Sequence, residues 1–362
     1  MHVIITGASG NLGTSVLAAL AREPAVTRVT AIARRPPTSA VAAADPRVQW
    51  HAADIAADDL GPQLRGADAL VNLAWAIQPS HDPEALWRTN VAGTARLLAS
   101  AAEARVGTIV HASSVGAYSP APKDRMVTED WPTHGIATSF YARHKAYAER
   151  VLDAVEAAHP ETRVVRVRPA LVFKREAASG IRRLFAGPLL PSFALRPSLI
   201  PLVPDTPGLR FQVVHSLDVG EAFRLILMGD TRGAFNLAAP DILDPAALGR
   251  ILGARPVPVP AAVLRAAAAT TWRLHLQPTP EGWVDLGLRS PIMDCSRAAR
   301  ELGWHPTHSA AASLLELIGG LRDAAGLPTP VLDPQAGGRM RIDELRSGVG
   351  ETEGRQANYA KE

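Results

Sequence analysis

The sequence predicts an α/β fold in which helices cover both faces of a doubly wound parallel sheet. In the first half of the 362-residue chain, short and nearly continuous apolar runs alternate with segments of helical character. A glycine-rich turn follows the first run, and such alternation is typical of β–α–β units. In chain order, the expected elements are a strand at 3–6 that ends in the turn, a helix at 12–22, strands at 26–33, 48–51 and 68–74, a long helix at 83–104, a strand at 108–112, a long helix at 139–158 and a strand at 163–168.

The second half of the chain is expected to form a smaller C-terminal substrate-binding region. After Phe173, proline and glycine become frequent and the apolar segments become short and irregular. We therefore expect a first domain at residues 1–173, whose sheet is rejoined by segments near 211–240, and a substrate-binding and lid region at 174–330. Residues 331–362 are polar and are expected to form a flexible tail.

The composition argues against several classes of partner. The net charge is +3 and no Lys/Arg-rich cluster occurs, so a nucleic-acid partner is not expected. Cys295 is the single cysteine, which excludes an internal disulfide, and we expect no metal site. A membrane span would need about 18 or more consecutive apolar residues, and the sequence contains no such run. The strand expected at the start of the chain leaves no room for a secretory signal. We therefore expect a cytoplasmic protein that acts on a small molecule.

The turn after the first strand reads Thr6-Gly7-Ala8-Ser9-Gly10-Asn11-Leu12-Gly13. In such a turn the first glycine permits a tight bend, the second lets the backbone approach a pyrophosphate, and the third allows the helix to pack closely on the strand. The helix N-terminus then presents N–H groups and a partial positive charge to the phosphates. Because the turn follows a strand and opens a helix, it predicts a Rossmann-type dinucleotide site.

The end of the second strand indicates which dinucleotide binds. NAD sites usually carry an acidic residue here, which binds the ribose 2′-hydroxyl. This chain instead has Ala31-Ile32-Ala33-Arg34-Arg35. Arginine suits a 2′-phosphate through its charge and its bidentate hydrogen bonding, and the alternative is a pair of solvated surface arginines. Arg34 and Arg35 therefore favour NADP(H) over NAD.

A tyrosine and a lysine on the helix at 139–158 predict redox chemistry. Tyr141 and Lys145 are four residues apart and so share one face of the helix. A nearby ammonium stabilises a phenolate, which lowers the pKa of the tyrosine toward neutrality. Tyr141 can then exchange a proton with a carbonyl or alcohol oxygen while a hydride moves to or from a nicotinamide. Ser114 follows the fifth strand and could hydrogen-bond the same oxygen.

The chain resembles the extended short-chain dehydrogenase/reductase superfamily, of the NAD-dependent epimerase/dehydratase type, from about residue 1 to about residue 310. Besides the glycine turn and the Tyr–Lys pair, the resemblance rests on motifs at residues 53–55, 72–75, 90–94, 111–118, 167–169, 214–219 and 302–306. It implies that Ser114, Tyr141 and Lys145 are catalytic. The cofactor-binding residues expected from the turn, the second strand and the resemblance are Gly7, Ser9, Gly10, Asn11, Leu12, Gly13, Arg34, Arg35, Asp54, Ile55, Leu73, Ala74, Trp75, Asn90, Lys145, Pro169 and Val172.

Three positions depart from branches of this superfamily. Its 4,6-dehydratases carry an acidic pair where this chain has Val115 and Gly116, which cannot do acid–base work. Its sugar epimerases frequently have an asparagine where this chain has Leu171. We therefore expect an oxidoreductase that interconverts a ketone and a secondary alcohol. A nucleotide-sugar 4-epimerase with a recycled cofactor, and a non-catalytic NADP(H)-sensing module, remain as alternatives.

The expected lid at residues 180–207 bears on the substrate. It is rich in Leu, Phe and Pro, which favours a partly hydrophobic carbonyl compound. Arg182, Arg183 and Arg196 leave open a phosphate or carboxylate handle, or they solvate the outside of the lid. Relatives in the superfamily often dimerise through the two long helices, so the resemblance also implies a homodimer.

Overall fold

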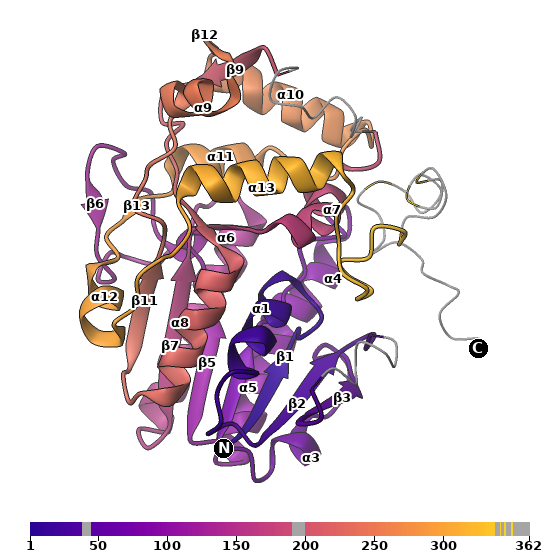
Figure 1. The fold of residues 1–362 in the computed structure, drawn as a ribbon, viewed down its shortest axis with the longest axis vertical. Coiled ribbons are helices and arrows are strands. Elements are labelled where there is room, and N and C mark those ends of the chain that lie inside the picture. The colour runs from indigo at the N-terminus through magenta and orange to yellow at the C-terminus, as the bar shows by residue number, and fades with distance from the viewer. Residues whose placement is uncertain (38–44, 190–199, 337–340, 342–343, 345–348, 350–362) are drawn as a thin grey trace.

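A seven-stranded parallel sheet forms the centre of the molecule (Figure 1). The computed structural model describes residues 1–37, 45–189, 200–336, 341, 344 and 349. The strands of the sheet are β1 His2–Thr6, β2 Arg28–Ala33, β3 Val48–Ala52, β4 Ala69–Asn72, β5 Thr108–Ala112, β7 Arg163–Pro169 and β11 Gly233–Leu237. Their order is β11-β7-β5-β4-β1-β2-β3, and every neighbouring pair is parallel. The expected doubly wound α/β fold is therefore confirmed.

The direction in which the sheet grows reverses between β1 and β4. The chain passes from β1 outward to β2 and β3, and then returns to place β4 on the other side of β1. Asn72 at the end of β4 lies beside Thr6 at the end of β1, and Thr6 Oγ1 donates a hydrogen bond to Asn72 Oδ1 at 2.7 Å. Ligands of open parallel sheets bind outside the carboxyl ends of the strands at such a point. The fold thus brings the glycine-rich turn and the segment after β4 to one crevice.

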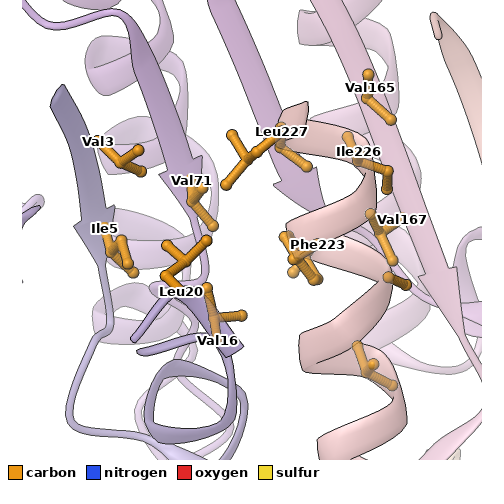
Figure 2. Close-up of a cluster of buried hydrophobic side chains, with 14 of the residues drawn as sticks. Val3, Ile5, Val16, Leu20, Val71, Val165, Val167, Phe223, Ile226 and Leu227 are labelled. Carbon is orange, nitrogen blue, oxygen red and sulfur yellow. The ribbon is translucent and has the colours of Figure 1, made fainter. Parts of the chain in front are cut away.

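Helices cover the sheet in two layers, α1 Asn11–Leu20 and α8 Ser216–Met228 on one face and α5 Thr94–Glu103 and α6 Phe140–Ala158 on the other (Figure 1). Successive strand residues alternate between these layers. Figure 2 shows Ile5 close to Leu20 in the first layer, and Phe223 on α8 facing Val167 within the same cluster. Ile4 belongs to the second layer. Because both faces are covered, the buried strands are continuous apolar runs, as the sequence indicated.

The long helix expected at residues 83–104 consists of three consecutive segments. These are α4 Pro83–Trp87, a π-helical segment Arg88–Gly93, and α5. The Asp82 side chain caps α4 by accepting a hydrogen bond from the N–H of Ala85 at 2.9 Å. Wider π-helical turns occur often at functional sites. Here the wider turn carries Asn90, which contacts the segment after β4.

Most of the C-terminal region lies over the carboxyl ends of the strands, whereas its helix α12 packs beside β11 at the edge of the sheet (Figure 1). Its helices are α7 Ala178–Ile181, α9 Pro245–Leu252, α10 Ala261–Arg273, α11 Gly282–Arg289, α12 Ser296–Leu302 and α13 Ala310–Arg322. Three small parallel pairs complete the strands, β8 Leu171–Phe173 with β10 Val213–His215, β9 Leu202–Asp205 with β12 Arg255–Pro258, and β6 Met126–Val127 with β13 Ile292–Met293. Short helical turns are α3 Gly61–Leu64 and the segments Val115–Ala117, Arg175–Ala177 and Arg182–Ala186. Across the described parts of the chain, no helix has the length and apolar character to cross a membrane.

Phe223 offers a test of the layer under α1 and α8. Its side chain is completely buried between α8 and the sheet. Replacing a buried phenylalanine by alanine leaves a cavity, so Phe223→Ala should lower the free energy of unfolding by about 3–5 kcal/mol. Leu217→Ala is the matched control, because Leu217 is on the same helix and 46% exposed. Urea denaturation followed by circular dichroism measures both, and equal losses in the two variants would contradict this packing.

Candidate active site

The glycine-rich turn is shaped by two close backbone approaches. Gly7 has a φ of +68°, and a Cβ added to it would lie 2.8 Å from the backbone N of Ala74. A Cβ on Gly13 would lie 2.4 Å from the carbonyl oxygen of Gly7. A Cβ on Gly10 would meet only the Gly7 carbonyl oxygen within 4 Å, at 3.3 Å. The turn therefore packs tightly on one side and leaves its backbone open at Gly10, which suits a pyrophosphate.

A cavity of about 300 Å³ lies at the crevice between β1 and β4. Its volume is at the lower end of the range for ligand pockets, about 300–1,000 Å³. The glycine-rich turn forms one part of its wall, and the ends of β2, β3 and β4 form others. Ten of the expected cofactor-binding residues line it, namely Gly7, Ser9, Gly10, Arg34, Arg35, Asp54, Ile55, Leu73, Ala74 and Trp75. These residues could hold a dinucleotide.

Seven other expected cofactor-binding residues do not line this cavity, namely Asn11, Leu12, Gly13, Asn90, Lys145, Pro169 and Val172. Several of them shape its surroundings. Asn11 Nδ2 donates to the carbonyl oxygen of Val172 at 3.2 Å, which joins α1 to β8. Asn90 is buried, its Nδ2 donates to the Ala76 carbonyl oxygen, and its Oδ1 accepts from the Ala76 N–H, each at 2.7 Å. Asn90 therefore fixes the backbone just after Trp75.

The C-terminal half contributes lining residues that local sequence patterns do not reveal. These include Gly180, Arg183, Leu184, Pro278, Pro330 and Val331. Arg183 donates to the carbonyl oxygens of Val331 and Asp333, and Thr329 Oγ1 donates to the carbonyl oxygen of Ser9 at 2.9 Å. Residues 329–333 are thereby tied to both the lid and the glycine-rich turn.

The three lid arginines differ in their surroundings. Arg182 is 5% exposed and forms an ion pair with Glu344, so it is no handle for a substrate anion. Arg183 lines the cavity, and burial lowers its pKa to about 10, with the nearby charges of Arg182 and Arg35 acting in the same direction. Arg196 lies outside the described residues.

The expected catalytic residues come together beside the cavity. Ser114 follows β5 and caps the short helical turn Val115–Ala117, its Oγ accepting the N–H of Gly116 at 3.0 Å. Tyr141 and Lys145 lie one turn apart on α6. The Ser114 side chain lies near the Tyr141 hydroxyl and acts to lower its pKa. The arrangement can therefore direct two hydroxyl groups at one substrate oxygen.

The Lys145 ammonium is buried, and it lies against an aromatic ring. Its Nζ donates to the Ala112 carbonyl oxygen at 2.7 Å and lies 3.5 Å from the ring centroid of Trp75. Burial lowers the pKa of Lys145 to about 7, although the charge of Glu149 acts in the opposite direction. Burial also raises the pKa of Tyr141, and the nearby Ser114 side chain opposes that shift. Lys145 Nζ is 5.8 Å from the Tyr141 ring centroid.

A buried ion pair fixes α6 against the sheet. Arg168 on β7 donates to both carboxylate oxygens of Glu149 at 2.9 Å, and Ser113 Oγ donates to Glu149 Oε1 at 2.6 Å. Burial alone would raise the pKa of Glu149, but the hydrogen bonds and charge of Arg168 lower it. Such bidentate pairs fix geometry as well as charge. Lys145 lies one turn before Glu149 on α6. The ion pair therefore fixes the position of Lys145 relative to β5 and to Ser114, which follows β5.

Two tryptophans flank Tyr141. Trp75 meets it edge-on, with ring centroids 6.1 Å apart, and Trp283 of α11 lies at 4.9 Å. The indole N–H groups of both tryptophans are buried, and neither has a hydrogen-bond acceptor among the residues that the structure describes. A Cβ on Gly116 would lie 2.9 Å from Tyr141 Cε1, so an acidic side chain there would displace the tyrosine ring. Among the residues that the structure describes, no cluster of metal-binding side chains accompanies the site.

Comparisons with known proteins identify the family of this chain. The chain matches the model of the NAD dependent epimerase/dehydratase family over residues 3–238. An uncharacterized protein of Mycobacterium tuberculosis is 27% identical over 358 residues, which cover 95% of this chain and 88% of that protein.

Two solved structures share the fold. A UDP-glucuronic acid 4-epimerase mutant from Bacillus cereus, in complex with a UDP-sugar and NAD, has a TM-score of 0.65 at 17% identity, covering 89% of this chain and 99% of that one. A dTDP-glucose 4,6-dehydratase mutant from Streptomyces venezuelae, with NAD bound, has a TM-score of 0.66 at 23% identity. The match covers 89% of this chain and 97% of that one. Since the family match over residues 3–238 covers more than half of the chain, the chain belongs to the NAD dependent epimerase/dehydratase family and is an enzyme of the extended short-chain dehydrogenase/reductase type.

Proposed function

We propose that this enzyme is an NADP(H)-dependent oxidoreductase that interconverts a ketone and a secondary alcohol on a small, partly hydrophobic substrate. The observation that carries the proposal is the meeting of Ser114, Tyr141 and Lys145 beside the cavity that begins at the glycine-rich turn. The aromatic surroundings of Tyr141, which include Trp283 and Phe185, favour an apolar substrate.

The proposed reaction depends on proton transfer at Tyr141 Oη. During reduction, Tyr141 gives its proton to the carbonyl oxygen while Ser114 hydrogen-bonds that oxygen. During oxidation, Tyr141 takes the proton back from the alcohol. A bound nicotinamide supplies or accepts the hydride. Lys145 would hold the nicotinamide ribose, and its positive charge would then favour the phenolate of Tyr141.

The NADP(H) preference rests on charge near the end of β2. Arg34 and Arg35 line the cavity there, and Arg183 adds a third arginine from the lid. Two acidic residues also line the cavity, namely Asp54 and Glu344. Asp54 follows β3, and its carboxylate accepts the N–H of Ala56 at 2.9 Å, whereas Glu344 forms an ion pair with Arg182. NAD-type recognition would place the acid at the end of β2. The arrangement therefore favours a ribose that carries a 2′-phosphate.

A nucleotide-sugar 4-epimerase is the second candidate, because solved structures of such enzymes share the fold. A 4-epimerase oxidises and re-reduces the same carbon, so it keeps its cofactor and consumes none. Denaturing the purified protein and identifying any released dinucleotide, alongside assays of net NADPH oxidation, separates the candidates. Stoichiometric retained cofactor with no net turnover of ketones would favour the epimerase. Dinucleotide binding without turnover of either substrate class would favour a sensing module.

Tyr141→Phe tests the proposed acid–base role. Removing the phenolic hydroxyl should lower kcat for NADPH-dependent ketone reduction by about 10²–10⁴-fold, because general acid catalysis contributes about that factor. The Kd for NADPH should change by less than about twofold, since binding does not need the hydroxyl. Tyr147→Phe is the matched control, because Tyr147 lies on the same helix and is 42% exposed. Near-normal turnover in Tyr141→Phe would refute the role.

Replacing Arg34 and Arg35 by alanine tests the cofactor preference. Hydrogen bonds to charged groups contribute about 1.5–3 kcal/mol, so the double variant should bind NADPH about 10–100-fold more weakly or worse. The Kd of the double variant for NADH, which lacks the 2′-phosphate, should differ from that of the natural protein by less than about threefold. Arg28→Ala is the control, because Arg28 is exposed at the opposite end of β2. Equal losses for NADPH and NADH, measured by calorimetry, would argue against a 2′-phosphate site.

A further inference from the structure

Trp75 stands between the cavity and the catalytic residues. It lies three residues after the end of β4, and it lines the cavity together with its neighbours Ala74 and Ala76. Ser114, Tyr141 and Lys145 are not among the residues that line the cavity. On its other side, the indole covers the Lys145 ammonium at 3.5 Å and meets the Tyr141 ring edge-on. A ligand that extends from the glycine-rich turn toward Tyr141 therefore meets the Trp75 side chain first.

The contacts of Trp75 leave its side chain, but not its backbone, able to change position. Asn90 holds the backbone of the next residue, Ala76, through two hydrogen bonds of 2.7 Å. The indole Nε1–H, in contrast, is buried and finds no acceptor within the described part of the chain. The ring is held by its cation–π contact with Lys145 and by edge contacts with Tyr141 and His111. Such a side chain gains a hydrogen bond if it turns toward a polar ligand.

We propose that Trp75 is a gate whose indole must turn away from Lys145 before a nicotinamide riboside can reach Lys145 and Tyr141. The inference rests on the proposed function, because it takes Lys145 as the group that binds the ribose. Lys145 already donates one N–H to Ala112, and the indole covers the approach to its ammonium. A ribose hydroxyl and the indole cannot both occupy that position. Trp75 is thus a positioning residue, which controls when Lys145 becomes available.

Trp75→Ala should therefore strengthen the binding of NADPH. If the indole covers Lys145 in about nine molecules of ten, the measured Kd of the natural protein is about tenfold weaker than that of the open form. Calorimetry should show a Kd for NADPH about five- to tenfold lower in Trp75→Ala. In stopped-flow mixing, the observed binding rate of the natural protein should saturate with NADPH concentration, and that of the variant should rise linearly. Trp75→Leu should give the same changes and provides a second route if the alanine variant folds poorly.

The adenosine half of the cofactor is the internal control. Adenosine 2′,5′-bisphosphate reaches Arg34, Arg35 and the glycine-rich turn without passing Trp75, so its Kd should be the same in all variants. Trp75→Phe keeps an aromatic face over Lys145 and should leave most of the gating. Trp87→Ala removes a tryptophan that is 47% exposed on α4 and does not line the cavity, so it should change neither Kd.

The possible results separate the gate from the proposed function. Weaker NADPH binding in Trp75→Ala, with the bisphosphate unaffected, would make the indole a platform for the nicotinamide and would overturn the gate. Unchanged NADPH binding in Trp75→Ala and Trp75→Leu would also overturn it, while leaving the oxidoreductase intact. If the natural protein prefers NADH, the gate is tested by comparing the Kd values of the same variants for NADH and for ADP. That result would overturn the NADP(H) preference and leave the gate open to the test. A natural protein that binds neither dinucleotide would overturn both.

Discussion

The parallel pairing of β1 with β4 is the constraint on which the site depends. It continues past the end of the strands, since the N–H of Leu73 donates to the carbonyl oxygen of Thr6 at 3.1 Å. This bond places the Leu73–Ala74 peptide against Gly7, so closely that a Cβ on Gly7 would lie 2.8 Å from the Ala74 nitrogen. The glycine-rich turn and the segment that carries Trp75 are therefore one packed unit. Any shift of the turn would move Trp75, and with it the cover on Lys145.

The second requirement is that a lysine stays buried beside the sheet. A buried ammonium loses hydration, which explains why the pKa of Lys145 falls to about 7. Three features offset this cost, namely the Ala112 carbonyl oxygen, the Glu149 charge and the Trp75 ring. A desolvated cation–π contact contributes about 2 kcal/mol, and an unsatisfied buried N–H costs about 1–3 kcal/mol. The cation–π contact therefore opposes a turn of the Trp75 indole, whereas a new hydrogen bond of its N–H would favour one.

Much of the fold and part of the site could be predicted from the sequence. Apolar runs such as Val3–Ile5 indicate buried strands, and Gly7, Gly10 and Gly13 indicate the glycine-rich turn. Both patterns can be recognised because each lies within a few neighbouring residues. The spacing of Tyr141 and Lys145 also follows from one helix. Arg183, Pro330 and Val331 could not be found as lining residues in this way, since their contacts join segments about 150 to 320 residues apart. The burial that raises the pKa of Tyr141, opposite to the expected influence of Lys145, likewise depends on the packed surroundings.

The residues that determine the chemistry and those that determine access therefore come from different parts of the chain. Ser114, Tyr141 and Lys145 are held by β5, α6 and the Glu149–Arg168 pair, all within the first 170 residues. Arg183, Trp283 and Pro330 approach the same site from the C-terminal half. The first group can stay fixed while the second varies, because no hydrogen bond or ion pair joins Arg168 or Glu149 to the described lid residues, 180–189 and 200–207. Substrate selectivity in this chain is thus expected to follow from the C-terminal half and from Trp75, where both groups meet.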